Sequence, residues 1–165
     1  MKSAFETPRR VGVITAFPPG RNSLNEFGFH LVTHMAQNDE LDRVVVFADE
    51  TDQGAPMQIE GTESVVSWKF NSLTNPIRLY QAVRRARVDS VIVNLQFATF
   101  GDTKLAGGVG LLVPLLLAKT GIPTGVILHN LVENVDMEDA GFAENKWIAK
   151  PVSYTHLTLP TILLV

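Results

Sequence analysis

The strongest restriction on the fold comes from residues 9–35, where an apolar run, a Pro/Gly loop and a helical pattern follow one another. Residues 11–14 are apolar and mostly β-branched, which is typical of a strand covered on both faces. Two prolines, which lack N–H donors, and the glycine at position 20 end this strand. Helical spacing then relates four apolar residues that we expect to face the core: Leu24, Phe27, Leu31 and Met35.

This helix would begin near the carboxyl end of the first strand, with Asn22 or Ser23 as its N-cap. The first turn of a helix presents free N–H groups and the positive end of the helix dipole. The sequence therefore predicts that this turn can hold an anion beside the first strand.

Four later segments repeat the strand pattern, at residues 44–48, 63–70, 91–95 and 124–128. Helical patterns separate them, one starting at Asn75 with Ile77, Tyr80 and Val83 facing inward, and one over residues 107–119 with Gly121 just after its end. Residues 40–43 are expected to be a polar turn, and residues 49–61 a polar surface connection. Strands that alternate with helices at this spacing predict an α/β fold, a Rossmann-like open parallel sheet with helices on both faces.

Composition excludes several classes of protein. The chain has 165 residues, of which 45% are hydrophobic, so it is long enough to bury a core and is not of the disordered type. A net charge of -3 offers no electrostatic case for binding nucleic acid. The chain has no cysteine and its longest apolar stretch, residues 107–129, is broken by Lys119 and Pro123, so we expect a cytoplasmic protein without a membrane span.

The two ends of the chain are expected to lie outside the domain. Residues 1–8 have no apolar core of signal-peptide length and are expected to be a disordered lead-in. Residues 152–161, VSYTHLTLPT, resemble the translation of a transposase adapter used in sequencing libraries. We therefore expect a domain over residues 9–150, truncated there, and an artefactual tail over residues 151–165. A genuine terminal strand is the alternative for the tail.

Polar residues follow several of the predicted strands, at the edge where open α/β sheets bind ligands. His129 closes the fifth strand, where it can position a ligand by hydrogen bonding or simply hold strand and loop together. Asn94 and Gln96 flank the end of the fourth strand, and their amides can bind sugar hydroxyls or fix a loop. The amides at Gly20 can approach a phosphate, or the glycine can serve only a turn. We expect Gly20, Asn94 and His129 to converge along one edge of the sheet.

Acidic side chains gather after the fifth strand, between residues 130 and 139. Their spacing matches no metal-binding loop motif, so no metal site is predicted.

Four motifs together resemble the N-terminal domain of GT-B-type glycosyltransferases, in particular the large retaining family called group 1 or family four. They are TAFPPG at residues 15–20, NEFG at residues 25–28, NLQF at residues 94–97 and GIPTGVILHN at residues 121–130. The resemblance implies the acceptor-binding half of an enzyme that transfers a hexose from a nucleotide-diphosphate sugar to a sugar or lipid-linked acceptor, with retention at the anomeric carbon. Family members commonly have two adjacent glycines in the first loop, whereas here Gly20 is followed only by Gly28.

The resemblance also assigns roles to residues. It implies His129 as a catalytic residue, and a donor-phosphate loop made of Gly20, Arg21 and Asn22. The acceptor side would be lined by Asn25, Glu26, Asn94, Gln96 and Asn130. It implies no bound cofactor and no metal, a nucleotide-diphosphate sugar as co-substrate, and a missing C-terminal domain that binds this donor. Peripheral membrane contact of the parent protein is compatible with it. The fragment alone would be inactive, because catalysis needs groups from both domains.

Two other classes stay open. The first is a non-catalytic Rossmann-like module, of receiver or flavodoxin type, that binds a ligand or partner. Receiver domains have an acidic pair after the first strand, where this chain has Thr15-Ala16-Phe17, and flavodoxin loops are richer in Ser and Thr than residues 18–21. The second is half of a GT-B-shaped epimerase, which only the missing half would distinguish from a transferase.

Overall fold

The computed structural model describes residues 9–20, 24–96 and 98–129. Five strands form one sheet: β1 (Arg9–Ile14), β2 (Leu41–Glu50), β3 (Thr62–Lys69), β4 (Ser90–Leu95) and β5 (Thr124–Leu128). Four helices accompany them: α1 (Asn25–Ala36), α2 (Asn75–Ala86), α3 (Lys104–Gly110) and α4 (Val113–Ala118). The predicted lead-in, the boundary near residue 150 and the tail over residues 151–165 lie outside the described residues.

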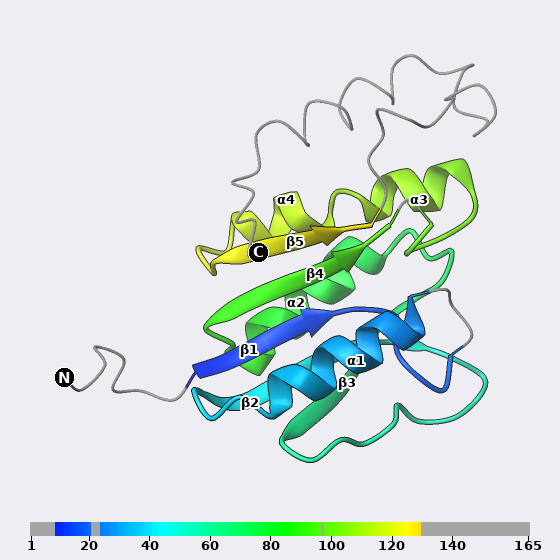
Figure 1. Ribbon diagram of the computed structural model, residues 1–165. Coiled ribbons are helices and arrows are strands. Elements are labelled where there is room, and N and C mark those ends of the chain that lie inside the picture. The colour runs from blue at the N-terminus through cyan, green and yellow to red at the C-terminus, as the bar shows by residue number, and fades with distance from the viewer. Residues whose placement is uncertain (1–8, 21–23, 97, 130–165) are drawn as a thin grey trace.

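The sheet is open and its strand order is β3-β2-β1-β4-β5. Every pair of neighbouring strands is parallel. Helix α1 lies on one face of this sheet, and α2, α3 and α4 lie on the other (Figure 1). The fold predicted from the sequence is therefore confirmed, because parallel strands joined by covering helices are what defines an open Rossmann-like sheet.

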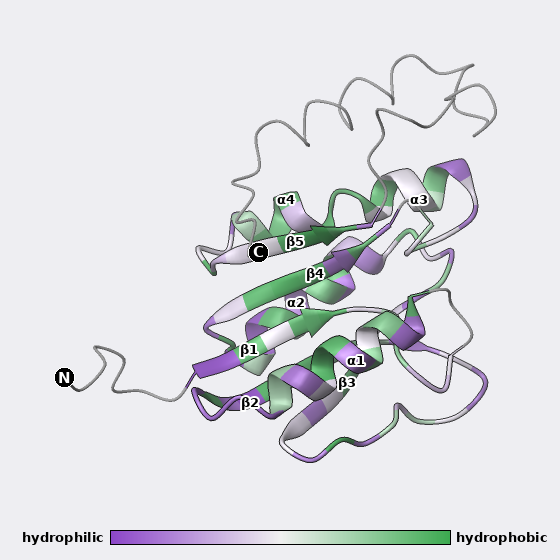
Figure 2. Ribbon diagram, viewed as in Figure 1, coloured by the Kyte–Doolittle hydropathy of each residue, from purple (hydrophilic) through white to green (hydrophobic). Residues whose placement is uncertain are grey.

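Two apolar cores fill the space between the sheet and its helices. On the α1 face, Val32 packs with Val13, Val44 and Val46, which are all fully buried. On the opposite face, Leu79 of α2 and Leu117 of α4 pack with the other face of the same strands. The inner strands are accordingly apolar along most of their length (Figure 2). Burial on both faces explains why these strands are continuous apolar runs and do not alternate with polar residues.

The strands extend beyond the apolar runs that predicted them. Strand β2 covers Leu41–Glu50 rather than residues 44–48, since Leu41 and Arg43 pair with β1, although Asp42 and Arg43 are exposed. Part of the predicted polar turn at residues 40–43 is therefore strand. Ladder hydrogen bonds join backbone groups, so a strand can continue where its side chains become polar.

The helix predicted over residues 107–119 is wrong as a single element, because two short helices, α3 and α4, occupy this region. Pro114 lies in the first turn of α4, where its missing N–H costs nothing. In the middle of a continuous helix the same proline would clash with the preceding turn. Gly121 has a φ of +77° after α4, as a left-handed turn residue there requires.

The inward face of α2 differs from the prediction at Ile77, whereas the predicted burial of Val83 is confirmed. Ile77 is 60% exposed, whereas Leu79 and Val83 are fully buried. The buried residues of α2 begin with Asn75, whose amide bonds both the N–H (3.0 Å) and the carbonyl (2.7 Å) of Lys69. This amide joins the start of α2 to the end of β3, and it sets which side of the helix faces the sheet.

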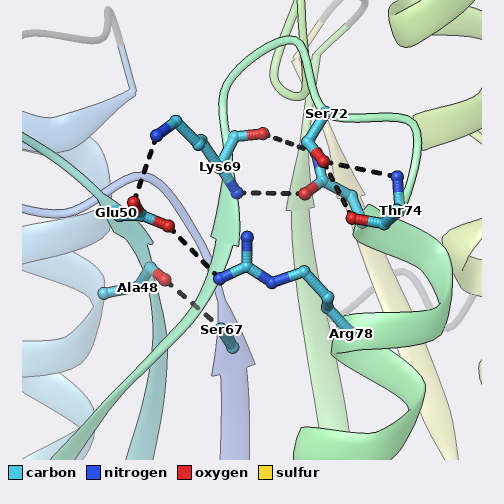
Figure 3. A network of polar contacts seen from close by, with 8 residues as sticks. Ala48, Glu50, Ser67, Lys69, Ser72, Thr74 and Arg78 are labelled. Atoms are coloured by element: carbon cyan, nitrogen blue, oxygen red, sulfur yellow. Dashed lines mark hydrogen bonds and ion pairs between the residues drawn. The ribbon is translucent and has the colours of Figure 1, made fainter.

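Charged residues link the ends of β2 and β3 to α2 (Figure 3). Glu50 accepts hydrogen bonds from Lys69 at 3.1 Å and from Arg78 at 3.4 Å. The hydrogen bond from Lys69, with a further contribution from Arg78, lowers the pKa of the Glu50 carboxyl. All three side chains are partly exposed, so these pairs orient the surface more than they stabilise the fold.

Candidate functional site

The sheet reverses its direction of growth between β1 and β4. Strand β2 lies beside β1, and β3 lies beside β2 on the same side. The chain then crosses back, and β4 and β5 lie on the other side of β1. Open parallel sheets bind ligands at the carboxyl ends of the strands beside such a reversal. Thr15, directly after β1, and Asn94, near the end of β4, lie at this point.

A hydrogen-bonded chain of three side chains spans the ends of β1, β4 and β5. The Asn94 Nδ2 lies 3.0 Å from the Thr15 Oγ1, and the Asn94 Oδ1 lies 2.6 Å from the His129 Nε2. Thr15 and Asn94 are completely buried, whereas His129 is only partly buried. The imidazole is therefore the member of this chain that a ligand can reach.

The directions of these hydrogen bonds follow from Thr15. Its hydroxyl donates to the Ala16 carbonyl at 2.9 Å, so the Oγ1 is left to accept from the Asn94 Nδ2. The Asn94 Oδ1 consequently faces His129 and accepts from its Nε2–H. Burial lowers the pKa of the His129 imidazole, which favours the neutral ring.

Phe27 contacts the imidazole ring, and a backbone hydrogen bond fixes the main chain of His129. The Phe27 and His129 rings meet edge to face, with centroids 4.4 Å apart and planes at 82°. The His129 N–H donates to the Leu95 carbonyl at 3.0 Å. Phe27 is 42% exposed, so its predicted place in the core is wrong, and the buried residues of α1 are Asn25, Gly28 and Val32. A helix whose first turn borders a site exposes part of its apolar side there.

The loop after β1 is fixed by a buried carboxylate. The Phe17 N–H donates to the Asp49 Oδ1 at 2.9 Å, and the Gly20 N–H donates to the Phe17 carbonyl at 3.2 Å. The Gly20 amide is therefore used inside the turn. Asp49 is only 8% exposed, and burial raises the pKa of its carboxyl more than the bond from Phe17 lowers it.

Asp49 was expected in a polar surface connection, and this is wrong, because it is a buried residue of β2. Its position at the carboxyl end of a strand, beside the first loop, is the sequence signal that could have identified it. Thr15 was likewise not singled out, although it directly follows the first predicted strand.

The first turn of α1 carries two of the predicted site residues. Glu26 is exposed there, and Asn25 is 7% exposed. Neither amide atom of Asn25 has a hydrogen-bond partner among the described residues. A Cβ built on Gly20 would lie 3.1 Å from the Asn25 Nδ2 and 3.0 Å from the Asp49 Oδ2. Loop, helix start and strand end are thus packed so closely that a side chain at position 20 would require these neighbours to shift.

The predicted site residues that the structure describes all lie at the carboxyl edge of the sheet or in the loops that leave it: Gly20, Asn25, Glu26, Asn94, Gln96 and His129. Gln96 opens the loop after β4, where its N–H donates to the buried Thr99 Oγ1 at 2.7 Å. Three other predicted residues, Arg21, Asn22 and Asn130, lie outside the described residues. Asn94 is completely buried and its amide bonds Thr15 and His129, so a ligand would meet it only through His129.

The described part of the chain holds no group of three His, Asp or Glu side chains that could bind a metal ion. Within that part, no helix has the length and apolar character that crossing a membrane requires. No protein-family model matches the chain, and no curated protein is similar enough to match it. Any function proposed for this protein therefore depends on the residues of this edge.

Proposed function

We propose that this chain is the N-terminal, acceptor-binding half of a retaining glycosyltransferase. The complete enzyme would transfer a hexose from a nucleotide-diphosphate sugar to a sugar or lipid-linked acceptor. Its donor-binding half, of similar Rossmann-like shape, would face the carboxyl edge of this sheet across a cleft. The nucleotide sugar enters as a co-substrate, and no resident cofactor takes part.

The observation that carries the proposal is the chain of hydrogen bonds from Thr15 through Asn94 to His129 at the reversal point of the sheet. It holds a neutral imidazole at the edge where open α/β sheets bind ligands. Together with the four motifs that resemble the glycosyltransferase family, this supports a site for an uncharged, hydroxyl-bearing ligand. Neutral hydrogen-bonding groups suit sugar hydroxyls, which both donate and accept.

The first turn of α1 would serve the charged part of the reaction. Its free N–H groups and dipole favour the negative charge that develops on the leaving nucleotide diphosphate. Gly20 would contribute by allowing close approach, because its own N–H is bonded to the Phe17 carbonyl. His129 would orient the reacting sugars, and its lowered pKa suits a neutral hydrogen-bonding role.

The test is to recover the natural reading frame that contains residues 9–129 and assay it for sugar transfer from nucleotide sugars. We expect transfer with retention of anomeric configuration, observed by NMR of the product. His129→Ala should lower kcat by about 10- to 100-fold, the loss expected for one or two well-placed hydrogen bonds.

His34→Ala is the matched control, because His34 is exposed near the end of α1 and, among the described residues, its ring bonds the His30 carbonyl alone. It should leave kcat unchanged. The 165-residue chain alone should show no turnover, since it lacks the donor-binding domain. Three results would contradict the proposal: turnover by the chain alone, epimerisation of the nucleotide sugar without an acceptor, or a parent protein without nucleotide-sugar chemistry.

A further inference from the structure

We infer that Thr15 and Asn94 are positioning residues that hold His129 in one neutral tautomer, with the hydrogen on Nε2 and Nδ1 offered as an acceptor. This assignment depends on three side chains and one carbonyl group, and it holds whatever reaction the parent protein performs. Thr15 and His129 each bond the Asn94 amide, so Thr15 would act on the imidazole through Asn94.

The first step concerns the Thr15 hydroxyl. A carbonyl oxygen can only accept, so the 2.9 Å contact with the Ala16 carbonyl uses the hydroxyl hydrogen. Asn94 must then present its Nδ2 to Thr15 and its Oδ1 to His129. An Oδ1 can only accept, so the imidazole nitrogen 2.6 Å away must carry a hydrogen.

The alternative arrangement requires three coupled changes. The Asn94 amide would rotate by 180°, the Thr15 hydroxyl would leave Ala16 to donate to the Oδ1 of Asn94, and the imidazole would carry its hydrogen on Nδ1. Thr15 and Asn94 have no exposed surface, so water cannot replace the lost bond to Ala16. A buried carbonyl left without its donor is unfavourable. The population of the first arrangement should therefore exceed that of the second by at least about tenfold.

Among the residues that the structure describes, no charged side chain bonds the His129 ring. The ring contacts the Asn94 side chain from β4 and the Phe27 ring from α1, while the Leu95 carbonyl accepts from the backbone N–H of His129. The free nitrogen, Nδ1, is then an acceptor on a neutral ring. It fits a ligand group that donates a hydrogen bond, such as a hydroxyl or an amide N–H, and it does not fit a phosphate or carboxylate oxygen.

The experiment is long-range ¹H–¹⁵N NMR on the full chain labelled at histidine, because the correlation pattern differs between the two tautomers. The chain has four histidines, and His129→Gln identifies the signals of His129. Near pH 8 we expect His129 to show the Nε2–H pattern alone. Averaged signals or the Nδ1–H pattern would overturn the inference.

Thr15→Val removes the hydroxyl with little change of shape, and we expect at least about a third of His129 to adopt the Nδ1–H form, since nothing then orients Asn94. Thr15→Ser should restore the wild-type pattern. Thr33→Val is the matched control, because Thr33 also donates its hydroxyl to a backbone carbonyl, that of Phe29. It should leave His129 unchanged. An unaltered His129 pattern in Thr15→Val would overturn the role of Thr15.

Asn94→Asp gives an independent measurement that also decides the case if Thr15→Val does not fold. A carboxylate in place of the amide would accept from the same Nε2–H and favour the imidazolium. We expect the pKa of His129, followed by the same NMR signals, to rise by about one to three pH units. An unchanged pKa would show that residue 94 does not contact the imidazole, and would overturn the inference.

Discussion

At the scale of single residues, the buried carboxyl of Asp49, which bonds the first loop, makes the stability of the fold depend on pH. Burial raises the pKa of its carboxyl in the folded protein, so the folded state keeps the proton to higher pH than the unfolded chain does. The contribution of Asp49 to stability is therefore fully present below the unfolded pKa, about 3.9. It is lost as the pH rises through the raised folded value.

Asp49→Asn should remove this loss, because the amide oxygen can still accept from the Phe17 N–H. We expect the free energy of unfolding of the variant, relative to wild type, to increase between pH 3 and pH 7. Urea denaturation at both pH values measures it. Asp52→Asn is the control, since Asp52 is exposed and should show a smaller change. A relative stability of Asp49→Asn that falls with rising pH would contradict the prediction.

At the scale of elements, the position of α1 depends on Gly28. A Cβ on this residue would overlap the Thr15 Oγ1 and would lie 2.6 Å from the Ala16 carbonyl oxygen. The helix therefore approaches the end of β1 as closely as backbone atoms allow. This contact places Phe27 against His129 and holds Thr15 in the hydrogen-bonded chain.

Gly28→Ala should destabilise the protein by about 1–3 kcal/mol through overpacking, although alanine favours a helix by about 1 kcal/mol over glycine. Chemical denaturation measures the change. Gly125→Ala, in β5, is the matched control, because, its two chain neighbours aside, no atom of the described residues lies within 4 Å of the Cβ it would add. It should cost little or stabilise the strand. Equal stability of Gly28→Ala and wild type would mean that α1 does not pack this closely on β1.

At the scale of the whole molecule, protection of the sheet should be uneven. Strand β1 has a neighbour on both sides and its residues 11–14 are buried, whereas every residue of β5, which pairs only with β4 among the described strands, is only partly buried. We expect amide hydrogens of β5 to exchange at least about tenfold faster than those of β1, by local opening. Hydrogen exchange followed by NMR would show this, and equal protection of the two strands would contradict it. Since β5 carries His129, a ligand bound there should slow its exchange.

Much of this fold could be read from local patterns. β-Branched runs, a Pro/Gly loop and helical spacing predict five parallel strands and the edge where Gly20, Asn94 and His129 meet, because burial on both faces leaves a continuous apolar signature in each strand. Local patterns failed in two ways. Leucine spacing predicts one helix where Pro114 begins a second one. Helical spacing also does not show that Phe27 and Ile77 are exposed.

The hydrogen-bond partners within the site could not be predicted from local sequence patterns. Asn94 bonds residues 79 positions before it and 35 positions after it, and Asp49 bonds Phe17 across 32 positions. No local pattern records such pairs, since a polar residue after a strand has the same sequence context whether it faces water or a buried donor. Whether such a residue faces water or a buried partner depends on the strand order and on how far the residue is buried. Both are determined only when the sheet assembles and removes the strand ends from water.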